Sequence, residues 1–206
     1  ALETDAELLP LLTEEFGDEI AAGTLELLHQ DVRTFDPKTI TGPYSLVANI
    51  PYYITGEIFR QFLTADHKPS SMTLLVQKEV AVRIVRAKKE SLLSLSVKAF
   101  GTPSYEFTVP RGAFKPAPNV DSAVISITNI QQDAFEGKSA EERFFTVLRA
   151  GFAHKRKQLA NNLGEIVPDP AARAALATVG IPERARSEDV SLSSWRSLTD
   201  ALSSYI

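Results

Sequence analysis

A change of pattern along the chain constrains its fold more than any other feature. Up to about residue 130, short apolar segments of strand character alternate with segments that place apolar residues at helical spacing; beyond that point the strand pattern disappears. Such alternation is typical of a parallel sheet with helices on both faces. We therefore expect an α/β domain over residues 1–132 and a small all-helical domain over residues 133–206.

The individual elements follow from apolar periodicity and from residues that cap or end helices. Asp5 and Thr55 are expected to cap helices, and segment 91–101, which fits both periodicities, is taken as a helix from Ser91 to Gly101. Two late strands flank a proline-rich loop, Pro110 to Pro118, and should pair antiparallel at the sheet edge. The strands are expected at 24–29, 45–50, 71–77, 105–109 and 123–128, and the later helices at 78–87, 140–153, 155–163, 170–179 and 192–202.

Composition excludes several kinds of site. The chain has no cysteine, so disulfides, thiol catalysis and cysteine-bound metals are ruled out. Its three histidines, His29, His67 and His154, are scattered, and no metal site is expected. No apolar run approaches the ~20 residues of a membrane span. The acidic start of the sequence lacks the regions of a signal peptide, and a cytoplasmic location is expected.

The formal net charge of −4 hides an uneven distribution. Residues 1–66 contain 12 acidic and three basic residues, whereas residues 67–130 contain four acidic and nine basic ones. In the last block, bases gather at Arg149 and at 155–157. A basic middle on an acidic chain fits a directed nucleic-acid face. On charge alone, however, solvated surface is the better interpretation.

The most informative motif is Asn49-Ile50-Pro51-Tyr52, at the carboxyl end of an expected strand, where open α/β sheets bind ligands. The side-chain oxygen of Asn49 and the carbonyl of Ile50 can accept both protons of an aromatic amine. They can thereby stabilise the cationic nitrogen that forms when this amine attacks a carbon electrophile. Pro51 would hold the turn rigid, and Tyr52 offers a face for base stacking. In isolation, the motif could equally be a strand end in which Asn49 caps and Tyr52 packs.

Four motifs in order set this stretch in a wider context: residues 49–55 (NIPYYIT), 75–80 (LVQKEV), 113–124 (AFKPAPNVDSAV) and 151–159 (GFAHKRKQL). Through them the chain resembles the small-subunit rRNA adenine N6,N6-dimethyltransferases of the kasugamycin-resistance type. The resemblance implies a Rossmann-like class I methyltransferase sheet followed by a helical rRNA-binding domain. It also implies S-adenosylmethionine as methyl donor, adenine N6 as the atom methylated twice, and the small ribosomal subunit as partner.

The resemblance also implies roles for individual residues. Glu3 matches the acid that binds the donor's ribose, and Asp31 the acid that receives its adenine amino group; Asn49 belongs to the same donor site. Phe114 matches the aromatic residue that sandwiches the target adenine opposite Tyr52, although it could instead anchor its loop in the core. The basic residues expected to contact RNA phosphates are Lys88, Lys89, Arg149, Lys155, Arg156 and Lys157.

The sequence departs from the family pattern at several points. Its ten glycines never form the Gly-x-Gly spacing of the donor-binding loop, and the first, central strand has no counterpart. We therefore expect an N-terminally truncated chain that binds S-adenosylmethionine weakly and is inactive alone. Tyr53 stands where the family more often has Asn and receives no role. Leu92-Leu93 replace a Tyr-Gly pair.

Two other functions remain open at this point. A non-catalytic assembly factor would bind the small subunit without a donor, which the missing glycine loop favours and the Asn49–Tyr52 motif opposes. A DNA adenine N6-methyltransferase would share that motif, but the helical segment with residues 154–157 argues against it.

Overall fold

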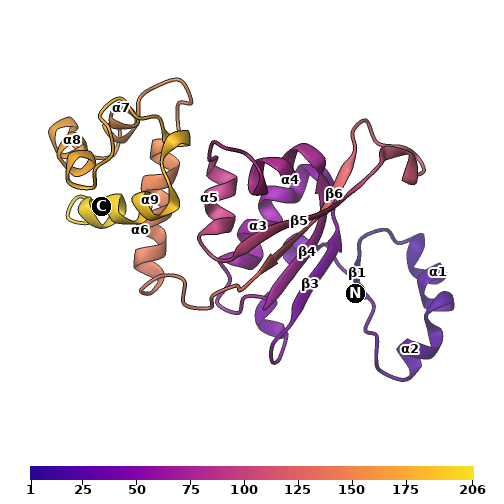
Figure 1. The fold of residues 1–206 in the computed structure, drawn as a ribbon. Coiled ribbons are helices and arrows are strands. Elements are labelled where there is room, and N and C mark those ends of the chain that lie inside the picture. Colours follow the sequence, from indigo (N-terminus) through magenta and orange to yellow (C-terminus); the bar gives the residue numbers. More distant parts are fainter. The chain divides into compact units, whose positions relative to one another are not determined.

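A four-stranded mixed sheet lies at the centre of residues 42–206, one of two units in the computed structural model, which describes residues 1–206. The sheet order is β3-β4-β6-β5, with β3 parallel to β4 and the other neighbours antiparallel (Figure 1). The expected antiparallel pair is therefore confirmed, with β5 at the edge. The strands are β3 (Ser45–Asn49), β4 (Ser71–Gln77), β5 (Thr102–Val109) and β6 (Ser122–Thr128).

Alternation along the strands sorts the side chains of this sheet into a buried and an open face. Met72, Leu74 and Val76 of β4 are completely buried, under helices α3 (Thr55–Leu63), α4 (Lys78–Val85) and α5 (Leu92–Lys98). Val47 of β3 points the other way and is 76% exposed. Because all three helices pack on the same face, the expectation of helices on both faces is wrong for residues 42–206.

The unit formed by residues 1–41 contains only short elements. Leu2 and Glu3 of β1 pair in parallel with β2, but the expected strand at 24–29 is reduced to its last two residues. The cause is helix α2, because the amides of Thr24 and Leu25 both donate to the carbonyl of Glu19. The elements are β1 (Leu2–Glu3), α1 (Leu8–Glu15), α2 (Gly17–Ala21), β2 (Leu28–His29), η1 (Val32–Thr34) and η2 (Pro37–Thr39).

The two expected helix caps were wrong in detail. The Asp5 carboxylate accepts from the amide of Glu7 at 2.9 Å, one residue before α1 begins. Thr55 is the first residue of α3, and its hydroxyl donates back to the carbonyl of Tyr52 at 3.0 Å. Ser91 does cap α5, in a reciprocal capping box with Ser94, so the helical interpretation of this ambiguous segment is confirmed.

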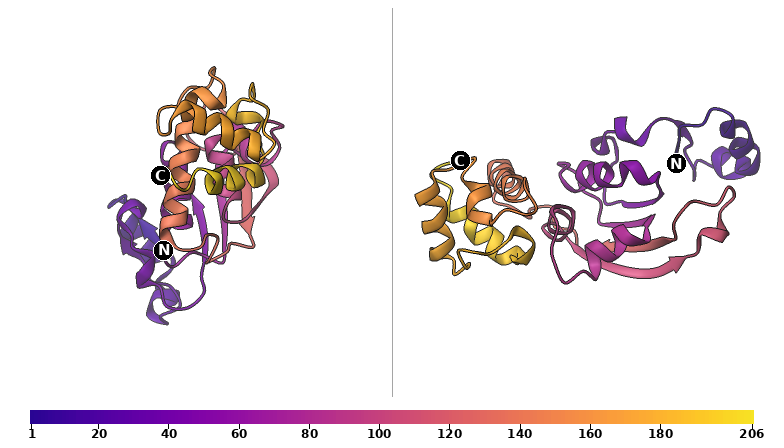
Figure 2. Two further views of the ribbon diagram at one scale, coloured as in Figure 1. Left: turned by 90° about the vertical axis from the view of Figure 1, so that its left-hand side faces the viewer. Right: turned by 90° about the horizontal axis from the view of Figure 1, so that it is seen from above.

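The C-terminal segment consists of four α-helices around the buried ring of Trp195, and they cluster in both views of Figure 2. Gly151 allows this packing, because a Cβ atom there would lie 2.3 Å from the Trp195 ring. The helices are α6 (Lys138–Gly151), α7 (Leu159–Leu163), α8 (Asp169–Thr178) and α9 (Leu192–Ala201). A single turn, η5 (Ser187–Asp189), lies between α8 and α9 in the chain. None of the chain's helices combines the length and apolarity that crossing a membrane requires.

Arg196 of α9 ties these helices to the end of α5 and to the segment between β6 and α6. Its guanidinium donates to the carbonyls of Ala134 and Ala99, at 3.0 and 2.8 Å, and lies 4.8 Å from the centre of the Phe135 ring. The helical cluster therefore has a fixed attachment at the C-terminal end of α5. It lies at the end of the sheet opposite the loop between β5 and β6 (Figures 1 and 2).

Candidate active site

The first wall of the candidate site is the turn that follows β3. The β3–β4 ladder ends at the pair Asn49 and Leu75, which leaves Asn49 exposed. Ile50 and Ile54 are each only 5% exposed and anchor the turn in the core. Between them, Pro51 leads into the single turn η3 (Tyr52–Ile54). Local sequence thus explains this wall: two buried isoleucines hold a proline turn that presents Asn49 and Tyr52 outward.

The second wall is the loop 110–121 between β5 and β6, which includes η4 (Arg111–Ala113) and a cis bond before Pro116. Asp121 closes the loop, because its carboxylate accepts from the amide of Arg111 at 3.1 Å. The Nζ atom of Lys78 lies 3.5 Å from the same carboxylate. The Arg111 amide, together with the Lys78 ammonium, holds the pKa of Asp121 below its ordinary value.

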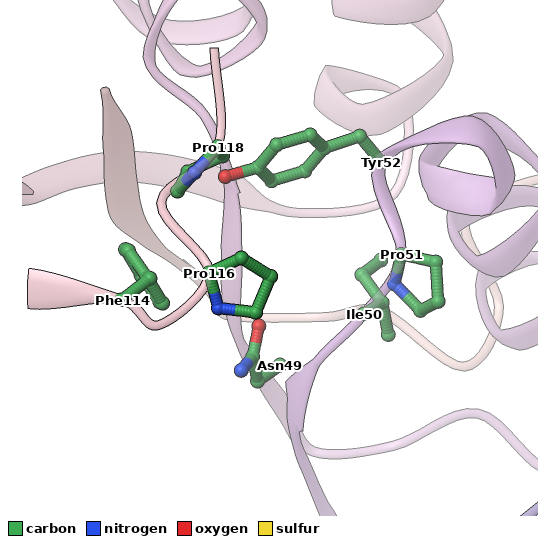
Figure 3. Close-up of a pocket in the computed structure, with 7 residues that line it drawn as sticks. All are labelled: Asn49, Ile50, Pro51, Tyr52, Phe114, Pro116 and Pro118. Atoms are coloured by element: carbon green, nitrogen blue, oxygen red, sulfur yellow. The ribbon is translucent and has the colours of Figure 1, made fainter. Parts of the chain in front are cut away.

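The two walls line a cavity of about 330 Å³ that is open to solvent. In Figure 3, Tyr52 enters from the turn after β3, and Phe114 enters with two prolines from the facing loop. The volume suits one small planar ligand, and the lining combines aromatic and aliphatic faces with a single side-chain amide. The structure thus brings together all five residues expected to carry the chemistry. The lining residues are Asn49, Ile50, Pro51, Tyr52, Phe114, Pro116 and Pro118.

One hydrogen bond joins the turn after β3 to β6 at this cavity. The hydroxyls of Tyr52 and Ser122 lie 2.6 Å apart, and Ser122 is completely buried. Sequence reasoning gave no role to Ser122, to Asp121 or to the prolines at 116 and 118, although all four belong to the motif at 113–124. The sequence offered one signal for these residues, their position in the same motif as Phe114. That position does not reveal that Ser122 bonds to Tyr52, 70 residues earlier in the chain.

The two acids expected to bind the donor lie in the other unit. The Glu3 carboxylate accepts from the amides of Thr4 and Asp5 through one oxygen, Oε1, at 2.7 and 2.8 Å. Both oxygens of Asp31 instead receive the Arg33 guanidinium, at 2.5–3.1 Å. This hydrogen bonding holds the pKa of Asp31 below its ordinary value. Glu3 therefore retains an oxygen that can accept from a ribose, whereas Asp31 is already paired.

The basic residues expected to contact RNA are all exposed but differ in their partners. Lys155 and Arg156 lie in the turn between α6 and α7, whereas Lys157 lies 3.6 Å from Glu165. Lys89 pairs with Glu188, and also with Asp189 at 3.4 Å; the pairing with Glu188 raises the pKa of Lys89. Lys88, Arg149, Lys155 and Arg156 form no ion pair and therefore remain candidates for phosphate contact. Nowhere does the structure gather three side chains suited to hold a metal ion.

Comparison with known proteins places these features in a family. The family model "Ribosomal RNA adenine dimethylase" matches residues 1–204. A protein of Dehalococcoides mccartyi named Ribosomal RNA small subunit methyltransferase A is 43% identical over 204 residues, which are 96% of this chain and 69% of that protein. A protein of the same name from Geobacillus thermodenitrificans is 36% identical, over 98% of this chain and 73% of its own length.

Solved structures agree with the sequence matches. The crystal structure of the 23S rRNA methyltransferase ErmE has a TM-score of 0.74 at 26% identity, covering 98% of this chain and 80% of that one. A dimethyladenosine transferase from Plasmodium falciparum has a TM-score of 0.81 at 20% identity, covering 99% and 81%, and so supports the fold. The α/β class I methyltransferase fold expected from the sequence is confirmed. The chain belongs to the ribosomal RNA adenine dimethylase family.

Proposed function

We propose that this chain carries the base-binding site of an enzyme that dimethylates N6 of adenines in small-subunit ribosomal RNA, in the cytoplasm, as a late step of ribosome assembly. The observation that carries the proposal is the meeting of Asn49, Tyr52 and Phe114 around one cavity. These residues come from segments more than 60 positions apart, and each supplies a different part of purine recognition. The family membership is consistent with this activity.

The chemistry follows from the lining of the cavity. An adenine between the rings of Tyr52 and Phe114 would gain roughly 1–3 kcal/mol from each stacking contact. Its N6 would lie at the end of β3, where the Asn49 amide oxygen and the Ile50 carbonyl accept both amine protons. These acceptors stabilise the tetrahedral, cationic nitrogen more than the planar amine, which is the requirement for catalysis. After the reaction, the acidic N6 proton can leave to solvent.

We propose S-adenosylmethionine as the methyl donor. When bound, this compound supplies an electrophilic methyl group on a sulfonium, which needs little activation beyond positioning. The second carboxylate oxygen of Glu3 is suited to accept hydrogen bonds from the ribose hydroxyls. Asp31 can receive an adenine amino group only by sharing its oxygens with Arg33. Asn49 is assigned to both the donor site and the base site.

We further propose that residues 1–132 form the methyltransferase domain and that residues 133–206 form the rRNA-binding domain. Lys155 and Arg156 would contact phosphates, with Arg149 on the neighbouring helix α6. Because the helical cluster and the loop 110–121 lie at opposite ends of the sheet, an RNA that reaches both must span this unit (Figure 1). The proposed partner is the folded RNA of the small subunit, recognised largely by its shape.

The decisive experiment replaces Asn49 in the complete gene product. Asn49→Ala removes one of the two acceptors for the amine, and we expect the methylation rate on unmethylated small subunits to fall about 10²–10³-fold. Binding to the subunit should change little, because most RNA affinity comes from phosphate contacts.

The matched control is Gln131→Ala, which removes an exposed amide side chain outside the cavity. It should methylate at the parent rate. If Asn49→Ala also methylates at that rate, the assignment of the active site is wrong. Methyl transfer to DNA in place of the subunit would reject the proposed substrate.

A further inference from the structure

Ser122 occupies a position from which it can control the shape of the base-binding cavity. It is the first residue of β6, and in the sheet it pairs with Gln77 on β4 and with Val109 on β5. Strands on both sides therefore fix its backbone, and its side chain is completely buried.

The Ser122 hydroxyl passes this rigidity to the site through Tyr52. The two hydroxyl oxygens are 2.6 Å apart, a normal distance for a hydrogen bond between hydroxyls. The Tyr52 ring is a rigid lever from Cβ to the hydroxyl, so a bond at its far end fixes where the ring lies, while rotation about the Cβ–Cγ bond leaves the hydroxyl in place. Because Ser122 is buried, leaving the serine hydroxyl without a partner is unfavourable.

The neighbouring residue holds the opposite wall. Asp121 accepts from the Arg111 amide and thereby closes the loop that carries Phe114. Asp121, just before β6, thus anchors the wall that carries Phe114, and Ser122, the first residue of β6, anchors the wall that carries Tyr52. Contacts within the protein therefore hold both walls of the cavity, which is the arrangement expected of a preorganised site.

We propose that Ser122 is a positioning residue for methylation: by holding the far end of the Tyr52 ring, it keeps this wall of the base-binding cavity in place before adenine enters. The inference rests on the proposed function, since it assigns the Tyr52 ring to the target base. It predicts that the Tyr52 hydroxyl matters for activity only through its bond to Ser122. A serine that merely satisfies its own hydroxyl in the core would have no such effect on catalysis.

The test is a double-mutant cycle in the complete gene product with unmethylated small subunits. Tyr52→Phe and Ser122→Ala each remove the same bond from opposite ends, and the double variant removes it once. We expect kcat to fall about 10-fold in each single variant, with KM for the subunit nearly unchanged, because a displaced ring misplaces the base without altering phosphate contacts. The double variant should be no slower than the slower single variant.

Two controls remove equivalent groups elsewhere. Tyr53→Phe deletes the hydroxyl of the adjacent tyrosine, which is 82% exposed, and Ser126→Ala deletes a hydroxyl further along β6 that bonds to Glu106. Both should keep the parent kcat. Urea unfolding, measured at the assay temperature, verifies that every variant is folded under the assay conditions. If Ser122→Ala does not fold, Tyr52→Phe still removes the bond from the other end.

The outcomes separate this inference from the proposed function. If the effects of the single variants multiply in the double variant, or if Ser122→Ala lowers stability while kcat stays at the parent value, the inference is overturned. Tyr52→Ala supplies the second comparison. If it is inactive while Tyr52→Phe is fully active, Tyr52 still binds the base and only the role of Ser122 is lost; if Tyr52→Ala is fully active, both proposals fail.

Discussion

At the scale of single residues, sequence reasoning located the parts of the site that depend on local order. Asn49 and Tyr52 lie at the cavity because they follow a strand and flank a proline turn, as local order predicts, while their chemical roles stay predictions. That Phe114 shares their cavity was expected from the resemblance alone, since nothing in local spacing brings residue 114 to residue 52. The bond from Tyr52 to Ser122 was missed for the same reason: its existence depends on how β4 and β6 pair.

Asp121 gives the loop 110–121 a dependence on pH. Its pKa is lowered in the folded chain, so its carboxylate stabilises the closed loop above about pH 4, and this contribution is lost as the pH falls through the lowered pKa. We expect the protection of the Arg111 amide against hydrogen exchange to decrease below pH 4. Asp121→Asn should already show reduced protection at pH 6, because an amide cannot attract Lys78.

The control for this prediction is Asp133→Asn, an exposed acid outside the loop. It should leave the Arg111 amide unchanged at every pH. Exchange rates measured by NMR decide the matter: a protection factor that depends on neither pH nor Asp121 would show that the loop is closed by other contacts.

At the scale of elements, strands with strong alternation of apolar residues were predicted well. A strand whose first residues can also extend the end of a helix was not. The strand Ser71–Gln77 was predicted with its observed bounds, because its alternate residues Met72, Leu74 and Val76 are completely buried. The strand at 24–29 was largely wrong, since the end of helix α2 takes the amides of Thr24 and Leu25. One-sided covering of the sheet was also missed, because periodicity tells which residues of a helix are apolar but not which face of a sheet they meet.

The turn between α6 and α7 and the segment after α4 are expected to differ in their contribution to RNA binding. Replacing Lys155 and Arg156 together by alanine should weaken binding to the small subunit and reduce the slope of log Kd against log salt by about 2, one for each lost phosphate contact. Lys89→Ala should leave the slope nearly unchanged, since Glu188 and Asp189 already neutralise this ammonium. Binding measured across a salt series checks both statements.

This comparison also tests the sequence-based set of RNA contacts. Equal reductions of the slope in both variants would restore Lys89 to the RNA-binding surface. An unchanged slope in the Lys155 and Arg156 variant would remove the turn from it.

At the scale of the whole molecule, the change from sheet to helices was predicted from the loss of strand pattern near residue 130. β6 ends at Thr128 and α6 begins at Lys138. The attachment between these parts could not be predicted, because Arg196 reaches the carbonyls of Ala99 and Ala134, 97 and 62 residues away. The proposed division near residue 132 stays a prediction.

Arg196 is expected to stabilise the attachment of the helical cluster at the C-terminal end of α5. Arg196→Ala removes two charge-assisted hydrogen bonds and a contact with the Phe135 ring, so the free energy of unfolding should fall by about 2–3 kcal/mol. Arg196→Lys should not restore it, since an ammonium cannot donate in two fixed directions from one plane. Urea unfolding provides the measurement.

Arg173→Ala is the matched control, because it removes an arginine that pairs with Asp169 and Glu183 on the surface. Its unfolding should resemble that of the parent. Equal midpoints for the Arg196 and Arg173 variants would mean that other contacts, such as the pairing of Lys89 with Glu188, hold the helices in place.

The pairing of Ser122 with both β4 and β5 has a consequence for the time at which this protein acquires its active form. Translation delivers the Asn49–Tyr52 turn some 70 residues before the serine that steadies it. A growing chain that has reached only β4 therefore holds an unsupported tyrosine and no slot for a base. Competence arises late in synthesis, when β6 inserts between its two neighbours.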